Sequence, residues 1–167
     1  MEISIEMIKT LRERCGAGVM DCRNVLAETG GDAEKALLML REKGLHQAKK
    51  KAERVTAEGL IEAYVHNGGR IGAIVELNCE TDFAARTDEF KELAHNLAMQ
   101  IAAQAPQCID EADLPEGTDV EPGVACLLLQ PYIRDPGLTI RDLITEAIAK
   151  VGENIRVSRF SRFELGN

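Results

Sequence analysis

Two segments flanking Asn67-Gly68-Gly69 constrain the fold of this chain more than any other feature. Residues 59–66 and 70–77 alternate between apolar and polar side chains, as strands with one buried face do. In the second segment, four aliphatic side chains share one face: Ile71, Ala73, Val75 and Leu77. An Asn-Gly pair between such segments supplies the positive φ angles of a tight turn. The sequence therefore predicts an antiparallel hairpin with one face in the core.

Helical spacing dominates the first 54 residues. Apolar residues recur every three or four positions in three stretches: residues 5–15, 19–26 and 36–40. The corresponding helices are expected to end at glycines: Gly16, Gly30 and Gly44. The basic segment 49–54 then predicts a solvent-exposed linker helix. We therefore expect residues 1–54 to form an N-terminal module of three helices with its linker helix, similar in size to ubiquitin-associated (UBA) domains.

Two longer helices are expected after the hairpin. Thr87 is a suitable N-cap for the first of them. The residues that follow place a broad apolar stripe on one side of that helix: Phe90, Leu93, Ala94, Leu97, Ala98, Ile101, Ala102 and Ala105. For the second helix, Thr139 and Asp142 have the spacing of a capping box, and Gly152 is expected to end it.

Residues 154–165 are expected to form the last strand. The apolar residues of this segment change phase between Val157 and Phe160, which predicts a β-bulge or burial on both faces. Together these elements predict an α+β fold, in which a three-stranded, mainly antiparallel sheet packs against two helices. Residues 55–167 would form this core domain.

Residues 106–138 interrupt the core domain with an unusual composition. All five prolines fall between Pro106 and Pro136, and this part of the chain carries seven acidic residues against one basic residue. Such a segment is expected to be a loop or a set of short extended pieces. The apolar run from Val124 to Leu129 is expected to pack over the core as a short helix or strand.

Charge and hydropathy exclude several classes of function. A formal net charge of −8 argues against broad binding to nucleic acids or anionic membranes, since phosphate groups attract basic surfaces. No apolar run approaches the roughly 20 residues that a membrane span needs. The N-terminus lacks the layout of a signal peptide, so a cytoplasmic location is expected. Five widely spaced cysteines without a C-x-x-C pair predict reduced thiols.

Catalytic and ligand-binding patterns give little signal in this chain. No glycine-rich phosphate loop is present, and the three histidines lack the spacing of metal ligands, so neither a cofactor nor a metal is expected. Cys79 and His95 could form a thiol pair in a small thiol enzyme. The acidic neighbours Glu80 and Asp82 would raise the pKa of that thiol, which disfavours a nucleophile. We expect no catalytic residue and a protein that acts by binding.

The turn between the second strand and the first long helix is the best candidate for function. It holds Thr81, Asp82 and Phe83, an acid and an aromatic residue side by side at a junction. Connecting segments carry function more often than the elements they join. Phe83 can be interpreted as a core residue folded under the helix or as a projecting apolar wedge. The residues alone leave both interpretations open.

Four parts of the sequence resemble the bacterial elongation factor Ts family in their order along the chain. They are residues 11–23, residues 50–59, residues 76–83, and residues 152–155 together with 162–164. Two departures stand out. Cys15 occupies a position where the family usually has Ser or Thr. The core is present once, whereas longer members carry a duplicated half and a coiled-coil insertion.

This resemblance implies a guanine nucleotide exchange factor for the GTPase elongation factor Tu, which promotes GDP release during translation elongation. Asp82 and Phe83, with Thr81 before them, would contact the partner. Phe83 would enter a pocket between helices near the bound magnesium, and Asp82 would help to shift the partner's backbone. The N-terminal module would dock through four residues: Arg12, Val19, Met20 and Arg23. A member with a single core half would pair with a second copy as a homodimer.

Other interpretations of the same residues remain open. Val19 and Met20 could instead belong to the core of the helical bundle. The whole chain could be an adaptor that recognises an apolar patch on another protein without affecting nucleotide exchange. A nucleotide-release assay would separate the adaptor from the exchange factor.

Overall fold

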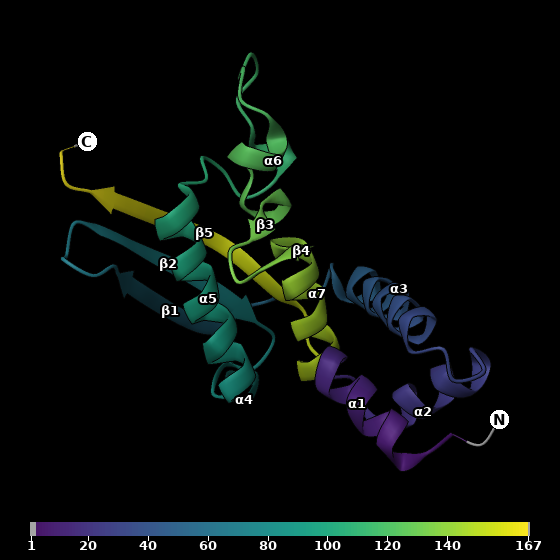
Figure 1. Ribbon diagram of the computed structural model, residues 1–167. Helices are drawn as coiled ribbons and strands as arrows, with labels where there is room; N and C mark the ends of the chain where they lie inside the picture. The colour runs from purple at the N-terminus through teal and green to yellow at the C-terminus, as the bar shows by residue number, and fades with distance from the viewer. Residues whose placement is uncertain (1–2, 167) are drawn as a thin grey trace.

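The computed structural model describes residues 3–166. Its first part is a module of three helices: α1 (Ile5–Cys15), α2 (Val19–Glu28) and α3 (Ala33–Lys51) (Figure 1). The Asp32 carboxylate accepts hydrogen bonds from the backbone N–H groups of Glu34 and Lys35 and so caps the N-terminus of α3. The module has its own small core, built from five buried residues: Leu11, Cys22, Val25, Leu26 and Ala36.

The third helix is longer than the sequence predicted. Gly44 does not end α3, which continues for seven more residues to Lys51. Gly44 is buried against helix α7 (Ile140–Val151), and a Cβ atom at this position would lie 3.7 Å from Cγ2 of Thr145. Glycine inside a helix costs about 1 kcal/mol relative to alanine. Close packing of α3 on α7 offsets that cost, so the expectation for Gly44 was wrong.

A three-stranded antiparallel sheet forms the centre of the molecule, as predicted. Its strands are β1 (Glu58–Val65), β2 (Ile71–Cys79) and β5 (Ile155–Glu164), in the order β1-β2-β5. The turn between β1 and β2 has positive φ angles at Gly68 and Gly69. The predicted bulge is also present: Leu77 pairs with Val157, but its neighbour Glu76 pairs with Arg159.

Helices α5 (Asp88–Gln104) and α7 lie across one face of this sheet (Figure 1). Thr87 caps α5 by accepting a hydrogen bond from the N–H of Phe90, and Thr139 and Asp142 form the predicted capping box of α7. Seven of the eight residues of the predicted stripe are buried. Ala105 is the exception, because it adopts a left-handed conformation after the end of α5 and is exposed.

Two polar side chains of α5 are buried among the apolar ones. The Asn96 carbonyl oxygen accepts a hydrogen bond from the Arg134 guanidinium. Gln100 donates to the side chain of Gln130 and accepts from the backbone N–H of Ile133. All three partner groups belong to the proline-rich segment, so these bonds attach that segment to the core.

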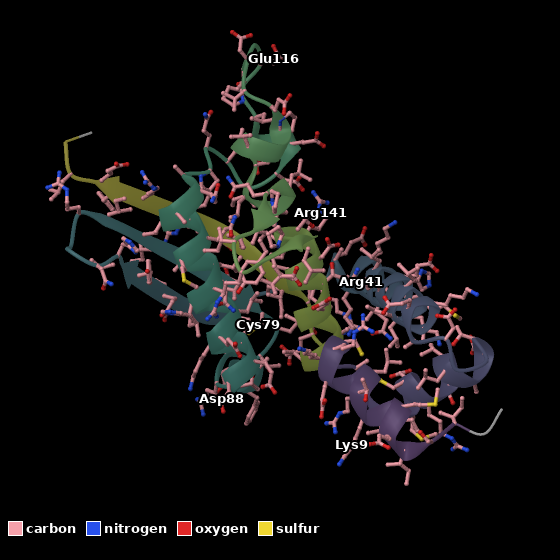
Figure 2. All side chains as sticks on the ribbon, in the orientation of Figure 1. Lys9, Arg41, Cys79, Asp88, Glu116 and Arg141 are labelled. Carbon is pink, nitrogen blue, oxygen red and sulfur yellow. The ribbon has the colours of Figure 1, made fainter. Side chains whose placement is uncertain are left out.

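Residues 106–138 fold as an excursion of short elements rather than as one open loop. In order these are η1 (Glu111–Asp113), α6 (Pro122–Ala125), η2 (Leu127–Leu129), β3 (Pro131–Tyr132) and the start of β4 (Asp135–Thr139). Leu127 belongs to the main core, whereas Ala125 and Cys126 form a small cluster with Cys108. Glu116 marks the outer tip of the excursion (Figure 2). No helix within residues 3–166 is both long and apolar enough to cross a membrane.

Candidate functional site

The corner between β2 and α5 contains a single-turn helix, α4 (Asp82–Ala85). Ala84 and Ala85 are buried and anchor this turn to the main core. Phe83 points the other way, and its side chain is 77% exposed. Of the two interpretations that the sequence left open for Phe83, the core residue is therefore excluded. The corner presents an aromatic ring to solvent on a turn whose opposite side is fixed.

The two neighbours of Phe83 have distinct local roles. The Asp82 carboxylate accepts a hydrogen bond from the Arg86 guanidinium at 2.7 Å, one turn further along the chain. Thr81 is the N-cap of α4, and its hydroxyl oxygen accepts from the N–H of Ala84 at 3.3 Å. The Asp82 charge is thus available at the surface beside Phe83, whereas Thr81 shapes the turn that carries both.

The turn between α1 and α2 forms a second exposed apolar patch. Val19 and Met20, the first residues of α2, are 49% and 59% exposed, so the structure places neither in the bundle core. Cys22 on the same helix points inward and is buried. Arg12 and Arg23 are exposed on α1 and α2, next to this turn in sequence. The four residues expected in docking are therefore all at the surface.

The C-terminal end of α7 lies between the two patches. Lys150 crosses the α1–α2 turn so closely that a Cβ atom on Gly16 would lie 1.9 Å from its Cε atom. Three residues later, the Glu153 carboxylate accepts hydrogen bonds from the backbone N–H groups of Glu80 and Thr81, at 3.1 and 3.0 Å. It also accepts a hydrogen bond from the Thr81 hydroxyl at 2.6 Å.

Sequence reasoning did not assign a role to Glu153. The only signal was its place in the segment Gly152-Glu153-Asn154-Ile155, which resembles the family but does not show what the carboxylate binds. Its hydrogen-bond partners lie more than 70 residues earlier in the chain, so no local pattern could have identified them.

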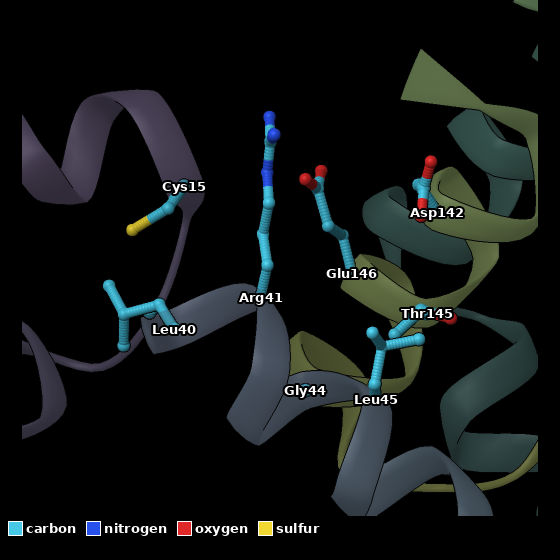
Figure 3. Close-up of a pocket in the computed structure, with 9 residues that line it drawn as sticks. Cys15, Leu40, Arg41, Gly44, Leu45, Asp142, Thr145 and Glu146 are labelled. Carbon is cyan, nitrogen blue, oxygen red and sulfur yellow. The ribbon is translucent and has the colours of Figure 1, made fainter. Parts of the chain in front are cut away.

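A small cavity of about 50 Å³ lies at the contact between the helical module and the core domain. Arg41 of α3 and Glu146 of α7 stand side by side at its edge, with Cys15 on the opposite wall (Figure 3). Burial raises the pKa of Glu146, although the positive charges of Lys150 and Arg41 act in the opposite direction. The cavity is too small for a nucleotide, and it belongs to the interface within the chain.

The structure offers little support for a thiol enzyme. Cys79 is buried at the end of β2, and its thiol donates a hydrogen bond to the carbonyl oxygen of Thr81 at 3.1 Å. Burial and the nearby Glu153 carboxylate raise the pKa of this thiol, in the direction expected but not through the Glu80 and Asp82 that the sequence suggested. His95 forms a 3.0 Å contact with the Glu62 carboxylate.

Within residues 3–166, no group of three or more His, Cys, Asp or Glu side chains is arranged to hold a metal ion. Two groups of exposed apolar residues lie beside the end of α7: Phe83 on one side, and Val19 with Met20 on the other. In Figure 1, α4 and the helical module both lie on the lower side of the molecule. Such an arrangement suits contact with another protein.

Comparison with known proteins identifies the family. A sequence model of the family described as "Elongation factor TS" matches residues 35–120. The elongation factor Ts of Carboxydothermus hydrogenoformans is 48% identical, in an alignment that covers 98% of this chain and 89% of that protein. The elongation factor Ts of Thermotoga neapolitana is 50% identical, with 99% of this chain and 98% of that protein covered.

These alignments run over 194 positions, more than the 167 residues of the chain, so the relatives carry additional residues. The identity nevertheless extends over both the helical module and the core domain. The chain belongs to the elongation factor Ts family.

Proposed function

We propose that this chain is a guanine nucleotide exchange factor for elongation factor Tu and that it acts by binding, without catalytic chemistry of its own. The observation that carries this proposal is the exposure of Phe83 on a firmly anchored corner. An exposed aromatic side chain buries little apolar surface within its own chain. It would bury more by entering a pocket of another protein. Membership of the elongation factor Ts family supports elongation factor Tu as that protein.

Each exposed patch has a separate task in this proposal. Residues 1–54 dock on the partner through Val19 and Met20, with Arg12 and Arg23 beside them. Phe83 then enters a pocket near the magnesium bound to the partner, while Asp82 displaces the partner's backbone. Exchange would take place in the cytoplasm, and the net charge of −8 favours a protein partner over nucleic acid.

Energetic linkage determines what the wedge must do. A factor that binds the empty GTPase more tightly than the GDP-bound one weakens GDP binding by the same ratio. Nanomolar affinity for a nucleotide corresponds to roughly 12 kcal/mol. Burying one Phe side chain supplies about 1.5–3 kcal/mol. Phe83 alone therefore cannot expel the nucleotide, and the lost magnesium and phosphate contacts of the partner must supply the rest.

A second copy of the chain is proposed to cover the outer face of the sheet. Ile61, Val65, Ile74 and Phe163 are exposed on that face. A shallow groove of about 190 Å³ lies between Ile61 and Ile74, beside the Glu76–Arg159 ion pair. Light scattering should then give the mass of a homodimer, and Ile74→Arg should give a monomer. A wild-type monomer at micromolar concentration would contradict this part of the proposal.

The exchange function is tested by release of a fluorescent GDP analogue from elongation factor Tu, chased with excess GDP in a stopped-flow instrument. Wild-type chain in catalytic amounts should accelerate release, and the rate should saturate as the concentration of GDP-bound elongation factor Tu is raised. An adaptor would bind elongation factor Tu and leave the release rate unchanged. That outcome would favour the adaptor hypothesis over the exchange function.

A further inference from the structure

The hydrogen bonds between the end of α7 and the 80–81 turn are reciprocal. The Glu153 carboxylate accepts three hydrogen bonds from Glu80 and Thr81, as described above. In return, the Glu80 carboxylate accepts a bond from the backbone N–H of Asn154 at 2.7 Å. Each segment thus caps the backbone of the other, and the two carboxylates fix the turn from both sides.

The same arrangement reaches the linker after α3. Asn154 is buried, and its side-chain amide donates hydrogen bonds to the carbonyl oxygens of Ala52 and Arg54 at 3.3 and 2.9 Å. The Arg54 guanidinium in turn lies 3.5 Å from the Glu80 carboxylate. Three segments far apart in sequence are therefore joined at one point: the linker after α3, the turn at residues 80–81 (the wedge turn) and the end of α7.

Phe83 depends on this support because its own element is too short to be stable alone. Helix α4 has four residues, fewer than an isolated helix needs to form. The Phe83 ring is mostly exposed, so packing of that ring cannot fix its position. Hydrogen bonds to a charged carboxylate are stronger than bonds between neutral groups, and three of them converge on the turn directly before α4.

Lys150 adds the other half of the geometry. Lys150 precedes Glu153 by three residues, and its side chain lies against the α1–α2 turn at Gly16. Gly16 has a φ angle of 63°, which a side chain would strain, and the absence of a Cβ atom leaves room for the lysine. One short segment, residues 150–154, therefore contacts both the turn between α1 and α2 (the docking turn) and the wedge turn.

From these contacts we propose that Glu153 is a positioning residue for nucleotide exchange: through the 80–81 turn it holds Phe83 at a fixed place relative to the docking turn. This inference rests on the exchange function proposed above. In this role Glu153 acts through the chain's own 80–81 turn and not by contact with the partner. Because Glu153 already restricts the position of Phe83, less conformational entropy is lost when Phe83 enters the partner's pocket. This preorganisation raises the rate of exchange.

Glu153→Gln tests the inference, because the amide keeps the shape of the side chain but can no longer accept all three hydrogen bonds. The maximal rate of stimulated GDP release should fall about tenfold, the effect of losing a charge-assisted hydrogen bond. The concentration of elongation factor Tu at half-maximal rate should stay unchanged, since docking is unaffected. Glu62→Gln is the matched control, as it weakens a carboxylate contact to His95 on the core domain.

A double-mutant cycle separates positioning from a general effect on the fold. If Glu153 acts through Phe83, then Phe83→Ala/Glu153→Gln should be no slower than Phe83→Ala alone. Amide hydrogen exchange should also become faster at residues 80 and 81 in Glu153→Gln, while the amides of α5 keep their protection. Additive losses in the double mutant, or an unchanged maximal rate in Glu153→Gln, would overturn the inference.

Two further outcomes are distinguishable. If Glu153→Gln does not fold, Glu153→Asp replaces it, because aspartate keeps the charge but its shorter side chain cannot reach both groups of Thr81. It is expected to show the same loss of maximal rate. If wild-type chain fails to accelerate release, the exchange function itself is overturned. If wild type accelerates release and Phe83→Ala slows it while Glu153→Gln and Glu153→Asp do not, only the positioning role fails.

Discussion

Phe83 and Phe90 lie at opposite ends of one strand-to-helix corner and have opposite environments. The Phe83 side chain is 77% exposed on α4, whereas that of Phe90, at the start of α5, is completely buried in the main core. Core packing accounts for Phe90 and leaves Phe83 without a role inside the chain. At this corner Phe90 therefore contributes to stability, whereas Phe83 is available for contact with a partner.

Stability should respond to these two residues very differently. Phe90→Ala removes a fully buried ring and is expected to lower the free energy of unfolding by about 3–5 kcal/mol. Phe83→Ala removes an exposed ring, so the change should stay within about 0.5 kcal/mol. Urea denaturation followed by circular dichroism measures both. A loss for Phe83→Ala close to that of Phe90→Ala would show that Phe83 is part of the core.

Gly59 is expected to be indispensable for the β1–β2 pair. Its φ angle is 151°, and a Cβ atom there would lie 2.1 Å from the backbone oxygen of Leu77 on the neighbouring strand. Backbone atoms cannot move aside as a flexible side chain can. Gly59→Ala should therefore cost about 1–3 kcal/mol or more in urea denaturation. Gly123→Ala, which has open space around the new methyl group, is the control and should be neutral.

The partly buried carboxyl of Glu146 predicts a pH dependence at the interface between the module and the core. Burial raises its pKa, so the folded chain favours the protonated form. The stability from this preference is complete below the unfolded-state pKa, about 4.3. It is lost as the pH rises through the raised pKa of the folded state. At pH 7 the carboxylate is thus held in an environment that disfavours its charge.

Glu146→Gln should consequently be more stable than wild type at pH 7, and the difference should shrink toward pH 4. Urea midpoints at both pH values measure it, with Glu116→Gln at the exposed tip of the excursion as the control. A variant that is less stable than wild type at pH 7 would mean that the attraction to Arg41 and Lys150 outweighs burial.

Three of the cysteines should behave as inert thiols in the folded chain. Burial raises the pKa of Cys22 and of Cys108 to about 11, and it raises that of Cys79 as well. Because the thiolate is the reactive form, iodoacetamide at pH 7.5 should label these three residues slowly in native buffer and rapidly in urea. Mass spectrometry of the labelled peptides gives the rates. Fast labelling of Cys79 in native buffer would instead support the interpretation of the chain as a thiol enzyme.

Local patterns were sufficient where each element depends on its own residues. The hairpin at Gly68 and Gly69 and the capping box of Thr139 and Asp142 are set by side chains and backbone angles within a few positions. Gly44 shows where such reasoning fails. A glycine ends a helix only when no tertiary contact favours its continuation, and the contact with α7 comes from about a hundred residues later in the chain.

The candidate site was predictable to a similar extent. Phe83 and Asp82 could be singled out because they follow a strand directly, and the family resemblance assigned them a task. The exposure of Phe83 could not be predicted, since a phenylalanine in a short turn fits a core position equally well. Glu153 was beyond sequence reasoning because a carboxylate that binds backbone N–H groups leaves no mark on the residues it binds.

The most direct test of the account compares wild type with Phe83→Ala in stimulated release of a fluorescent GDP analogue from elongation factor Tu. Burial of the ring is worth about one to two decades in rate. Phe83→Ala should therefore bind elongation factor Tu, as measured by calorimetry, but release GDP at least about tenfold more slowly than wild type at saturation. Release at the wild-type rate, with the variant folded and bound, would contradict the central claim that an exposed Phe83 acts as the wedge.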